Sequence, residues 1–187
     1  MSSQTDDRVL AAADRLFYER GIAGVSMAQL RDEAGVSLRR LYQLHPTKRE
    51  LVAAWLTTRH EQWMAWLTGE VDRRVAATGI DPVLAAFDSV SAWAAAPGYR
   101  GCAFLNSLAE AGEIDATHRA IVAGHKQDLD AWLASQLRQG HPDAPAWLAQ
   151  ALGVLLDGAI VRAVVQTSTT PVIAARAAAA ELLEHHP

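Results

Sequence analysis

The chain has 187 residues, half of them apolar, which suits one compact body or a small domain on a larger one. Its single cysteine, Cys102, excludes an intrachain disulfide, and no Cys/His group has the spacing of a zinc site. Residues 1–7 are polar and acidic, unlike a secretory signal, and no apolar run approaches the roughly 20 residues that cross a bilayer. We therefore expect a cytoplasmic protein without a metal, a cofactor or a membrane partner.

The charge is distributed unevenly around a net value of −4. Residues 1–50 contain eight Lys/Arg and seven Asp/Glu, whereas residues 51–187 contain nine and fourteen, so the excess of acid lies in the second part. Residues 37–49 hold four basic side chains and no acidic one. A positive patch on an acidic body suits a protein that approaches phosphates with one end, although a solvated basic face alone would be about as common.

Two helices are predicted before the basic patch. The first runs from about Asp6 to Arg20 and ends at Gly21. The second begins after Ser26, which forms a capping-box pattern with Gln29. It ends after two turns at Gly35, because glycine accepts the left-handed conformation that closes a helix.

The basic patch covers a third short helix and the start of a fourth. Ser37 is placed to cap a helix over residues 38–44, and Pro46 forces its end. Thr47 and Glu50 form another capping box, which begins a fourth helix that is expected to end at Gly69.

Caps, prolines and apolar spacing predict five further helices, over residues 82–95, 102–111, 115–139, 144–166 and 171–184. The second of these helices is expected to end at Ala111, and the third is expected to begin at Asp115. No segment has convincing strand alternation. The predicted fold class is all-α with about nine helices.

The short second and third helices are joined by Gly35, Val36 and Ser37. A glycine in so tight a turn lets two helices meet steeply, which is the helix-turn-helix arrangement. Its second helix can lie in the major groove of DNA, which is about as wide as one helix. The exposed face of that helix would carry Leu38, Arg39, Arg40, Tyr42 and Gln43, and its buried face Leu41 and His45.

The whole pattern from Arg8 to Leu51 resembles the DNA-binding domain of the TetR family of repressors. The resemblance is carried by Ala12-Ala13, Leu16-Phe17, Gly21, Ser26-Met27, Ala34-Gly35-Val36-Ser37, Leu41-Tyr42, Lys48 and Leu51. Residues 97–106 also resemble a stretch found in one branch of that family. The family implies a three-helix helix-turn-helix domain over residues 1–50 and a larger helical domain over residues 51–187 for ligand binding and dimerisation.

The resemblance also implies roles for the residues around the third helix. Arg39 would read a guanine edge with two hydrogen bonds, while Tyr42 and Lys48 would bind phosphate. Two positions depart from the family pattern, because His45 stands where phenylalanine is common and Arg49 where an acid is common. The expected DNA-binding residues are Ser26, Ser37, Leu38, Arg39, Arg40, Tyr42, Gln43, His45 and Lys48.

Aromatic residues of the larger domain are candidates for lining a ligand cavity, although core packing explains most aromatic side chains. The candidates are Trp63, Trp66, Phe87, Trp93, Phe104, Trp132 and the polar Asn106. Glu110, one turn after Asn106, is a second possible polar anchor or a surface residue. The last two helices are expected to form the dimer interface, with contacts from Leu148, Leu152, Leu155, Ile160, Val164, Ala175, Ala179 and Leu182.

The function expected from these features is that of a DNA-binding transcriptional regulator, which is a homodimeric repressor on a palindromic operator in double-stranded DNA. An unidentified small-molecule effector would release it. No nucleophile elbow, phosphate-binding glycine loop or metal-ligand cluster points to an enzyme. The alternative is a helical dimeric interaction or ligand-sensing module that does not bind DNA.

Overall fold

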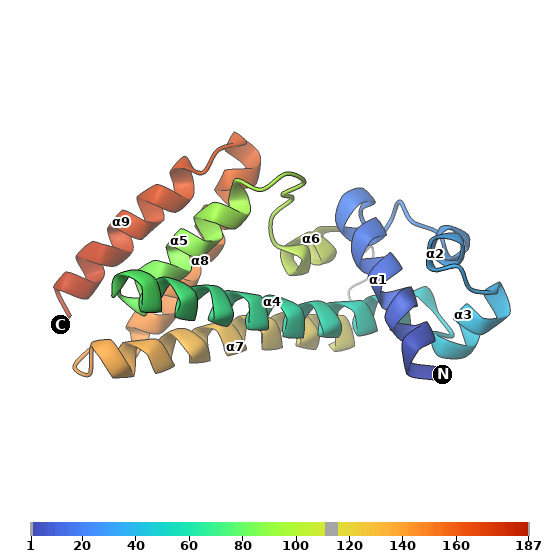
Figure 1. Ribbon diagram of the computed structural model, residues 1–187, viewed down its shortest axis with the longest axis horizontal. Coiled ribbons are helices and arrows are strands. Elements are labelled where there is room, and N and C mark those ends of the chain that lie inside the picture. The colour runs from blue at the N-terminus through green and yellow to red at the C-terminus, as the bar shows by residue number, and fades with distance from the viewer. Residues whose placement is uncertain (1, 111–115, 187) are drawn as a thin grey trace. The chain divides into compact units, whose positions relative to one another are not determined.

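The computed structural model describes residues 2–110 and 116–186, and the regular structure in these ranges is helical. The helices, drawn in Figure 1, are α1 (Ser2–Arg20), α2 (Met27–Ala34), α3 (Leu38–Leu44), α4 (Lys48–Thr78), α5 (Pro82–Ala94), α6 (Ala103–Glu110), α7 (Ala116–Gly140), α8 (Trp147–Gln166) and α9 (Thr170–Glu184). The prediction of an all-α fold with about nine helices is confirmed.

Three predicted helix bounds are wrong by three residues or more, and two others, Ala111 and Asp115, lie outside the described residues. The eighth helix begins at Trp147 rather than Ala144. The first helix begins at Ser2 rather than Asp6. The fourth does not end at Gly69 but continues to Thr78. A glycine inside a helix costs only about 1 kcal/mol relative to alanine, and here the next turn buries Val71 and pairs Glu70 with Arg74. The chain leaves the helix at Gly79, which has a φ of +68°.

The described chain divides into two compact units. The first unit comprises residues 1–62 and 103–123, and so contains α1, α2, α3, the first half of α4, α6 and the start of α7. The second unit comprises residues 63–102 and 124–187, with the remainder of α4 and α7 and all of α5, α8 and α9. The division of function expected at residue 50 stays a prediction, because compactness alone does not assign a function.

The core of the first unit forms where α1 packs on α2 and α2 meets α3 (Figure 1). Phe17 of α1 contacts Trp55 of α4 edge to face, with ring centroids 5.2 Å apart. The buried apolar side chains from these four helices include Val9, Ala13, Leu16, Phe17, Leu30, Ala34, Leu41, Leu51, Trp55 and Leu56. They are the apolar stripes expected from helical spacing.

The second unit is built around α5, which packs against both α8 and α9. Phe87 of α5 is fully buried, and Arg176 of α9 donates to Asp88 of α5 at 2.6 Å. Asp81 caps α5 by accepting from the backbone N–H groups of residues 83 and 84, and its second oxygen lies 2.9 Å from Nε2 of His141. The start of α5 is thus joined to the loop after α7.

Helix α8 is apolar on two faces. One face packs inward through residues such as Leu152 and Leu156, while the other exposes Val154, Val161 and Val165. As a result, α8 is long and apolar enough to cross a membrane, with a mean hydropathy of 1.7, contrary to the expectation that no apolar run approaches this length. Within the chain 44% of that segment is buried, and a single helix of this kind is weak evidence for a membrane span, because core helices of soluble proteins can have the same length and composition.

The two faces of α8 also correct the residues expected at a dimer interface. The expected residues that are buried inside this one chain are Leu148, Leu152, Ile160, Ala175 and Ala179. Val164 is exposed, and Leu155 and Leu182 are half-buried. The prediction selected the most regular apolar stripe, which packs in the chain's own core, whereas the outward face carries the exposed valines and Ile173.

Arg8 of α1 fixes the turn between α2 and α3. Its Nη2 atom donates to the carbonyl oxygens of Ala34 and Gly35, at 2.5 and 2.8 Å. These carbonyls belong to the end of α2, where helical hydrogen bonds run out, so a cationic donor there satisfies them and matches the negative end of the helix dipole.

We therefore predict that Arg8→Met lowers the free energy of unfolding by about 1–2 kcal/mol, because two charge-assisted hydrogen bonds are lost at a partly solvated site. Urea denaturation followed by circular dichroism measures this. Arg20→Met, which removes an exposed arginine from the same helix, is the matched control and should change stability by less than about 0.5 kcal/mol. Equal effects of the two changes would contradict the role of Arg8.

Candidate nucleic-acid interface and aromatic cluster

Local capping sets the bounds of α2. Ser26 has an extended backbone, and its hydroxyl accepts from the N–H of Gln29 while the Gln29 side chain accepts from the N–H of Ser26. At the other end Gly35 adopts φ +61° and ψ +42°, and the N–H of Val36 donates to the carbonyl of Arg31 at 3.2 Å. The predicted capping box and the predicted glycine stop are both present.

Helix α3 begins directly after this turn. Ser37 has an extended backbone, and its hydroxyl accepts from the N–H of Arg40 at 3.1 Å, so it caps the helix as predicted. Leu41 is fully buried and fixes the inner face of α3 against the core. The outer face is therefore presented to solvent in a defined orientation.

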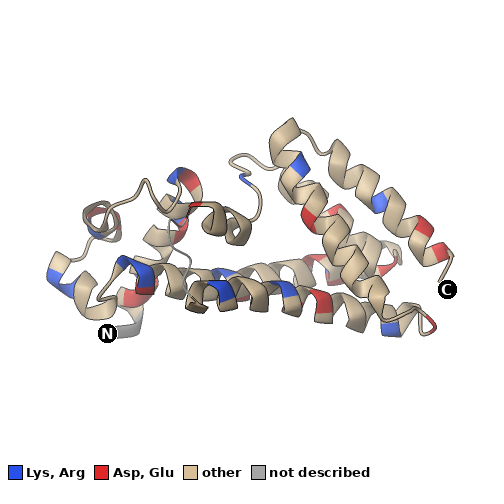
Figure 2. Cartoon of the chain, turned by 180° about the vertical axis from the view of Figure 1, so that it is seen from behind, with Lys and Arg blue, Asp and Glu red and all other residues tan. Residues whose placement is uncertain are grey.

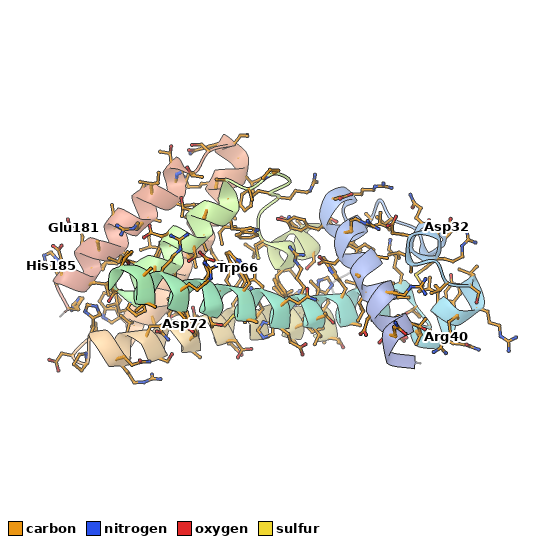
Figure 3. The ribbon with its side chains drawn as sticks, in the orientation of Figure 1. Asp32, Arg40, Trp66, Asp72, Glu181 and His185 are labelled. Atoms are coloured by element: carbon orange, nitrogen blue, oxygen red, sulfur yellow. The ribbon has the colours of Figure 1, made fainter. Side chains whose placement is uncertain are left out.

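The outer face of α3 exposes the side chains that the sequence placed there. Leu38 and Tyr42 are 38% and 44% exposed. Arg39 and Gln43 are exposed and Arg40 is half-buried. Figure 2 shows basic and no acidic residues on α3, and Figure 3 labels Arg40 on α3 and Asp32 on α2. An exposed, basic, short helix of this kind fits the major groove.

Two of the expected DNA-binding residues instead make contacts within the first unit. His45 is only 7% exposed, and its Nε2 lies 2.8 Å from a carboxylate oxygen of Asp6. Lys48 is half-buried at the start of α4, where its Nζ donates to the carbonyl of Ile22 at 2.5 Å, and burial lowers the pKa of its ammonium group. Ser26 remains exposed, but its hydroxyl is used in the cap of α2.

In the second unit, three of the residues expected to line a ligand cavity come together. The rings of Trp63, Trp66 and Trp93 contact one another pairwise, with centroids 6.2–6.5 Å apart and tilts of 48–67°. Trp66 lies on the side of α4 that faces α5 and is 37% exposed (Figure 3). These contacts unite α4 with the end of α5.

The cluster has two further members that were not among the predicted ligand residues. Tyr99 packs edge to face on Trp93 at 4.9 Å, and His125 of α7 packs on Trp63 at 5.2 Å. We call the set Trp63, Trp66, Trp93, Tyr99 and His125 the aromatic cluster. Aromatic composition could have drawn attention to Tyr99, but only the fold brings His125 to this place.

The other expected ligand residues are distributed over both units. Phe87 is fully buried in the core of α5, and Phe104 is buried at the start of α6 in the first unit. Asn106 is half-buried on α6, and Trp132 is half-buried on α7. Within residues 2–110 and 116–186, no group of three His, Cys, Asp or Glu side chains is arranged to hold a metal ion.

Comparison with known proteins matches both the helix-turn-helix and the whole fold. The family described as bacterial regulatory proteins, tetR family, matches residues 9–55. The HTH-type transcriptional regulator TtgR of Pseudomonas putida is 37% identical over 60 residues. That match spans 32% of this chain and 29% of TtgR, so less than a third of either protein is compared.

Two solved structures resemble nearly the entire chain. A TetR-family transcriptional regulator of Streptomyces coelicolor has 25% identity and a TM-score of 0.82, over 98% of this chain and 96% of that one. A putative regulator of the same family from Streptomyces avermitilis has 29% identity and a TM-score of 0.77, over 97% of each chain. The two comparisons agree, because residues 9–55 match the tetR family and the whole chain has the fold of these two regulators.

Proposed function

We propose that the protein is a sequence-specific, DNA-binding transcriptional repressor that a small-molecule ligand releases from its operator. The observation that carries this proposal is the outer face of α3, which exposes Leu38, Arg39, Tyr42 and Gln43 on a helix capped at Ser37 and joined to α2 by a tight turn. The match of residues 9–55 to the tetR family supports it, and so does the similarity of this part of the chain to the transcriptional regulator TtgR.

The residues of α3 and its surroundings divide into two roles. Arg39 is exposed to solvent and is the candidate for a bidentate contact to a guanine, while Leu38 can pack against a thymine methyl group. Arg40 and the hydroxyl of Tyr42 are candidates for phosphate contacts, which set orientation and salt dependence rather than base preference. Lys48 would reach a phosphate only by exchanging its bond to the Ile22 carbonyl, and the burial of His45 favours a packing role for it.

We expect selection from a random DNA pool to enrich a palindrome, and Arg39→Ala to weaken binding to it by about tenfold or more, because a bidentate base contact contributes roughly 1–3 kcal/mol. Fluorescence anisotropy at several salt concentrations measures both affinity and salt dependence. The control is Arg20→Ala, which removes the same charge from an exposed site at the end of α1. Failure to enrich any sequence, with no binding at low salt, would favour the alternative of a helical module without DNA binding.

We also propose that the protein forms a homodimer through α8 and α9. These helices expose Val154, Val161, Val165 and Ile173, of which Val154 and Val165 are 67% and 78% exposed. Beside Val154 lies a groove of about 520 Å³ whose lining includes Gly158, Ala174 and Ala178, small residues that let helices approach closely. Figure 2 shows few charged residues along α9. A second copy of the chain would cover this face with an identical one, as twofold symmetry requires.

On this proposal, Val154→Glu converts a dimer to a monomer, because each interface would bury two carboxylates without partners. Sedimentation equilibrium measures the change from twice the chain mass to once. Ala131→Glu adds the same charge at an exposed helical position of α7 and should leave the dimer intact. A wild-type protein that is monomeric at micromolar concentration would overturn the proposal of a dimer.

The aromatic cluster is the proposed place for the effector. Indole rings offer flat apolar surface, which suits a planar aromatic compound. The exposure of Trp66 leaves part of that surface open to solvent.

A screen of planar aromatic molecules is therefore expected to find compounds that raise the melting temperature of the wild-type protein. These compounds should not raise the melting temperature of Trp66→Ala. They should still raise that of Trp147→Ala, which removes an exposed tryptophan from α8 in the same unit. Hits that respond equally to both changes would place the effector elsewhere.

A further inference from the structure

Glu110, the last residue of α6, reaches the turn between α1 and α2, although the two lie 88 residues apart in the sequence. Its Oε2 atom accepts a hydrogen bond from the backbone N–H of Ile22. The same carboxylate packs against Gly21, where a Cβ atom would lie 2.7 Å from Oε2 and 3.0 Å from Oε1. Gly21 also has a φ of +78°, so both its backbone conformation and its missing side chain suit this contact.

The carbonyl side of Ile22 is held as well. The Nζ atom of Lys48, at the start of α4, donates to the Ile22 oxygen at 2.5 Å. Both backbone polar groups of one loop residue are thus bonded to charged side chains from two different helices. Hydrogen bonds with a charged partner are roughly twice as strong as neutral ones. The backbone of Ile22 is therefore held by stronger hydrogen bonds than the backbone of a residue in an ordinary turn.

Helix α6 is itself fixed inside the first unit. Ser107 is buried, donates to the carbonyl of Phe104 at 2.7 Å and lies 2.8 Å from Nε2 of the buried His118 on α7. Phe104 is buried one turn earlier. The carboxylate of Glu110 therefore extends from an anchored helix.

We propose that Glu110 is a positioning residue for the helix-turn-helix. By holding Ile22, Glu110 fixes the conformation of the loop that leads from α1 into α2. Helix α2 ends at the Gly35 turn, from which α3 begins, so the position of α2 determines the position of α3. The DNA-binding unit is then discontinuous in sequence, since it needs α6 as well as the N-terminal helices. The link to DNA affinity rests on the function proposed above, whereas the placement of α3 can be measured without DNA.

Hydrogen exchange and amide chemical shifts of the full-length protein test the placement. With Glu110→Ala, the amide of Ile22 is expected to exchange at least about tenfold faster, because a charge-assisted hydrogen bond is lost, and amides of residues 38–44 should shift. The amides of Leu30 and Leu41 report whether the core stays folded. Glu61→Ala, which removes an exposed carboxylate from α4, should do neither. Unchanged exchange at Ile22, or unmoved amides in α3, would overturn the proposal.

A double-mutant cycle gives a second measure. Gly21→Ala should destabilise the wild type more than it destabilises Glu110→Ala, because part of its cost is the close approach of the carboxylate. Additive effects would show that Glu110 does not press on this turn in solution.

Operator affinity completes the test. Glu110→Ala should bind the selected operator about three- to tenfold more weakly than the wild type, because a loosened turn must be ordered on binding. Glu110→Gln keeps a neutral acceptor, so its operator affinity should lie between those of the wild type and Glu110→Ala. An unchanged affinity would overturn the role in DNA binding even if Ile22 exchanged faster. If the wild type bound no DNA, the proposed function would fail, while the amide shifts of α3 would still decide whether Glu110 positions that helix.

Discussion

The turn between α2 and α3 is the constraint on which the exposed outer face of α3 depends. Two helices can meet here only if Gly35 takes a left-handed conformation and if the carbonyls at the end of α2 find donors. Glycine meets the first condition, while the N–H of Val36 and the guanidinium of Arg8 meet the second. With the turn closed, Leu41 is buried, and Leu38, Arg39, Tyr42 and Gln43 face solvent. Exposure of Arg39 and Tyr42 is thus a consequence of backbone geometry and burial together.

The second unit follows another rule, in which helices with two apolar faces use one for the chain's own core. α8 buries Leu152 and Leu156 and exposes Val154 and Val165. The exposed face is costly to leave in water, and contiguous apolar surface of this kind usually marks an interaction site. The same property makes α8 resemble a membrane-spanning segment by length and composition. The two observations have one physical origin, namely apolar side chains around most of the helix circumference.

Sequence reasoning succeeded where the determining contacts are local. The bounds of α2 and α3 follow from Ser26, Gly35 and Ser37, whose capping hydrogen bonds reach only three or four residues along the chain. Sequence reasoning failed where packing decides. The free-energy cost of a glycine inside a helix is small compared with the packing of the next turn of α4, so the helix continues past Gly69. The contact of His45 with Asp6 and that of His125 with Trp63 span too much sequence for periodicity to reveal. The aromatic candidates were recognised as a set, but their grouping required the fold.

The continuity of α4 has a consequence for how such proteins can diversify. Its 31 residues form one uninterrupted helix, about 46 Å long at 1.5 Å per residue, and it supplies side chains to both compact units. A recombination event at residue 50 would join the N-terminal segment of one such protein to the remainder of another, within the first turn of this helix. The hybrid would inherit Gly21 and Ile22 from one parent and the residue at position 110 from the other. Exchange of operator specificity between relatives should therefore proceed more readily by substitutions on α3 than by transplanting the whole N-terminal segment.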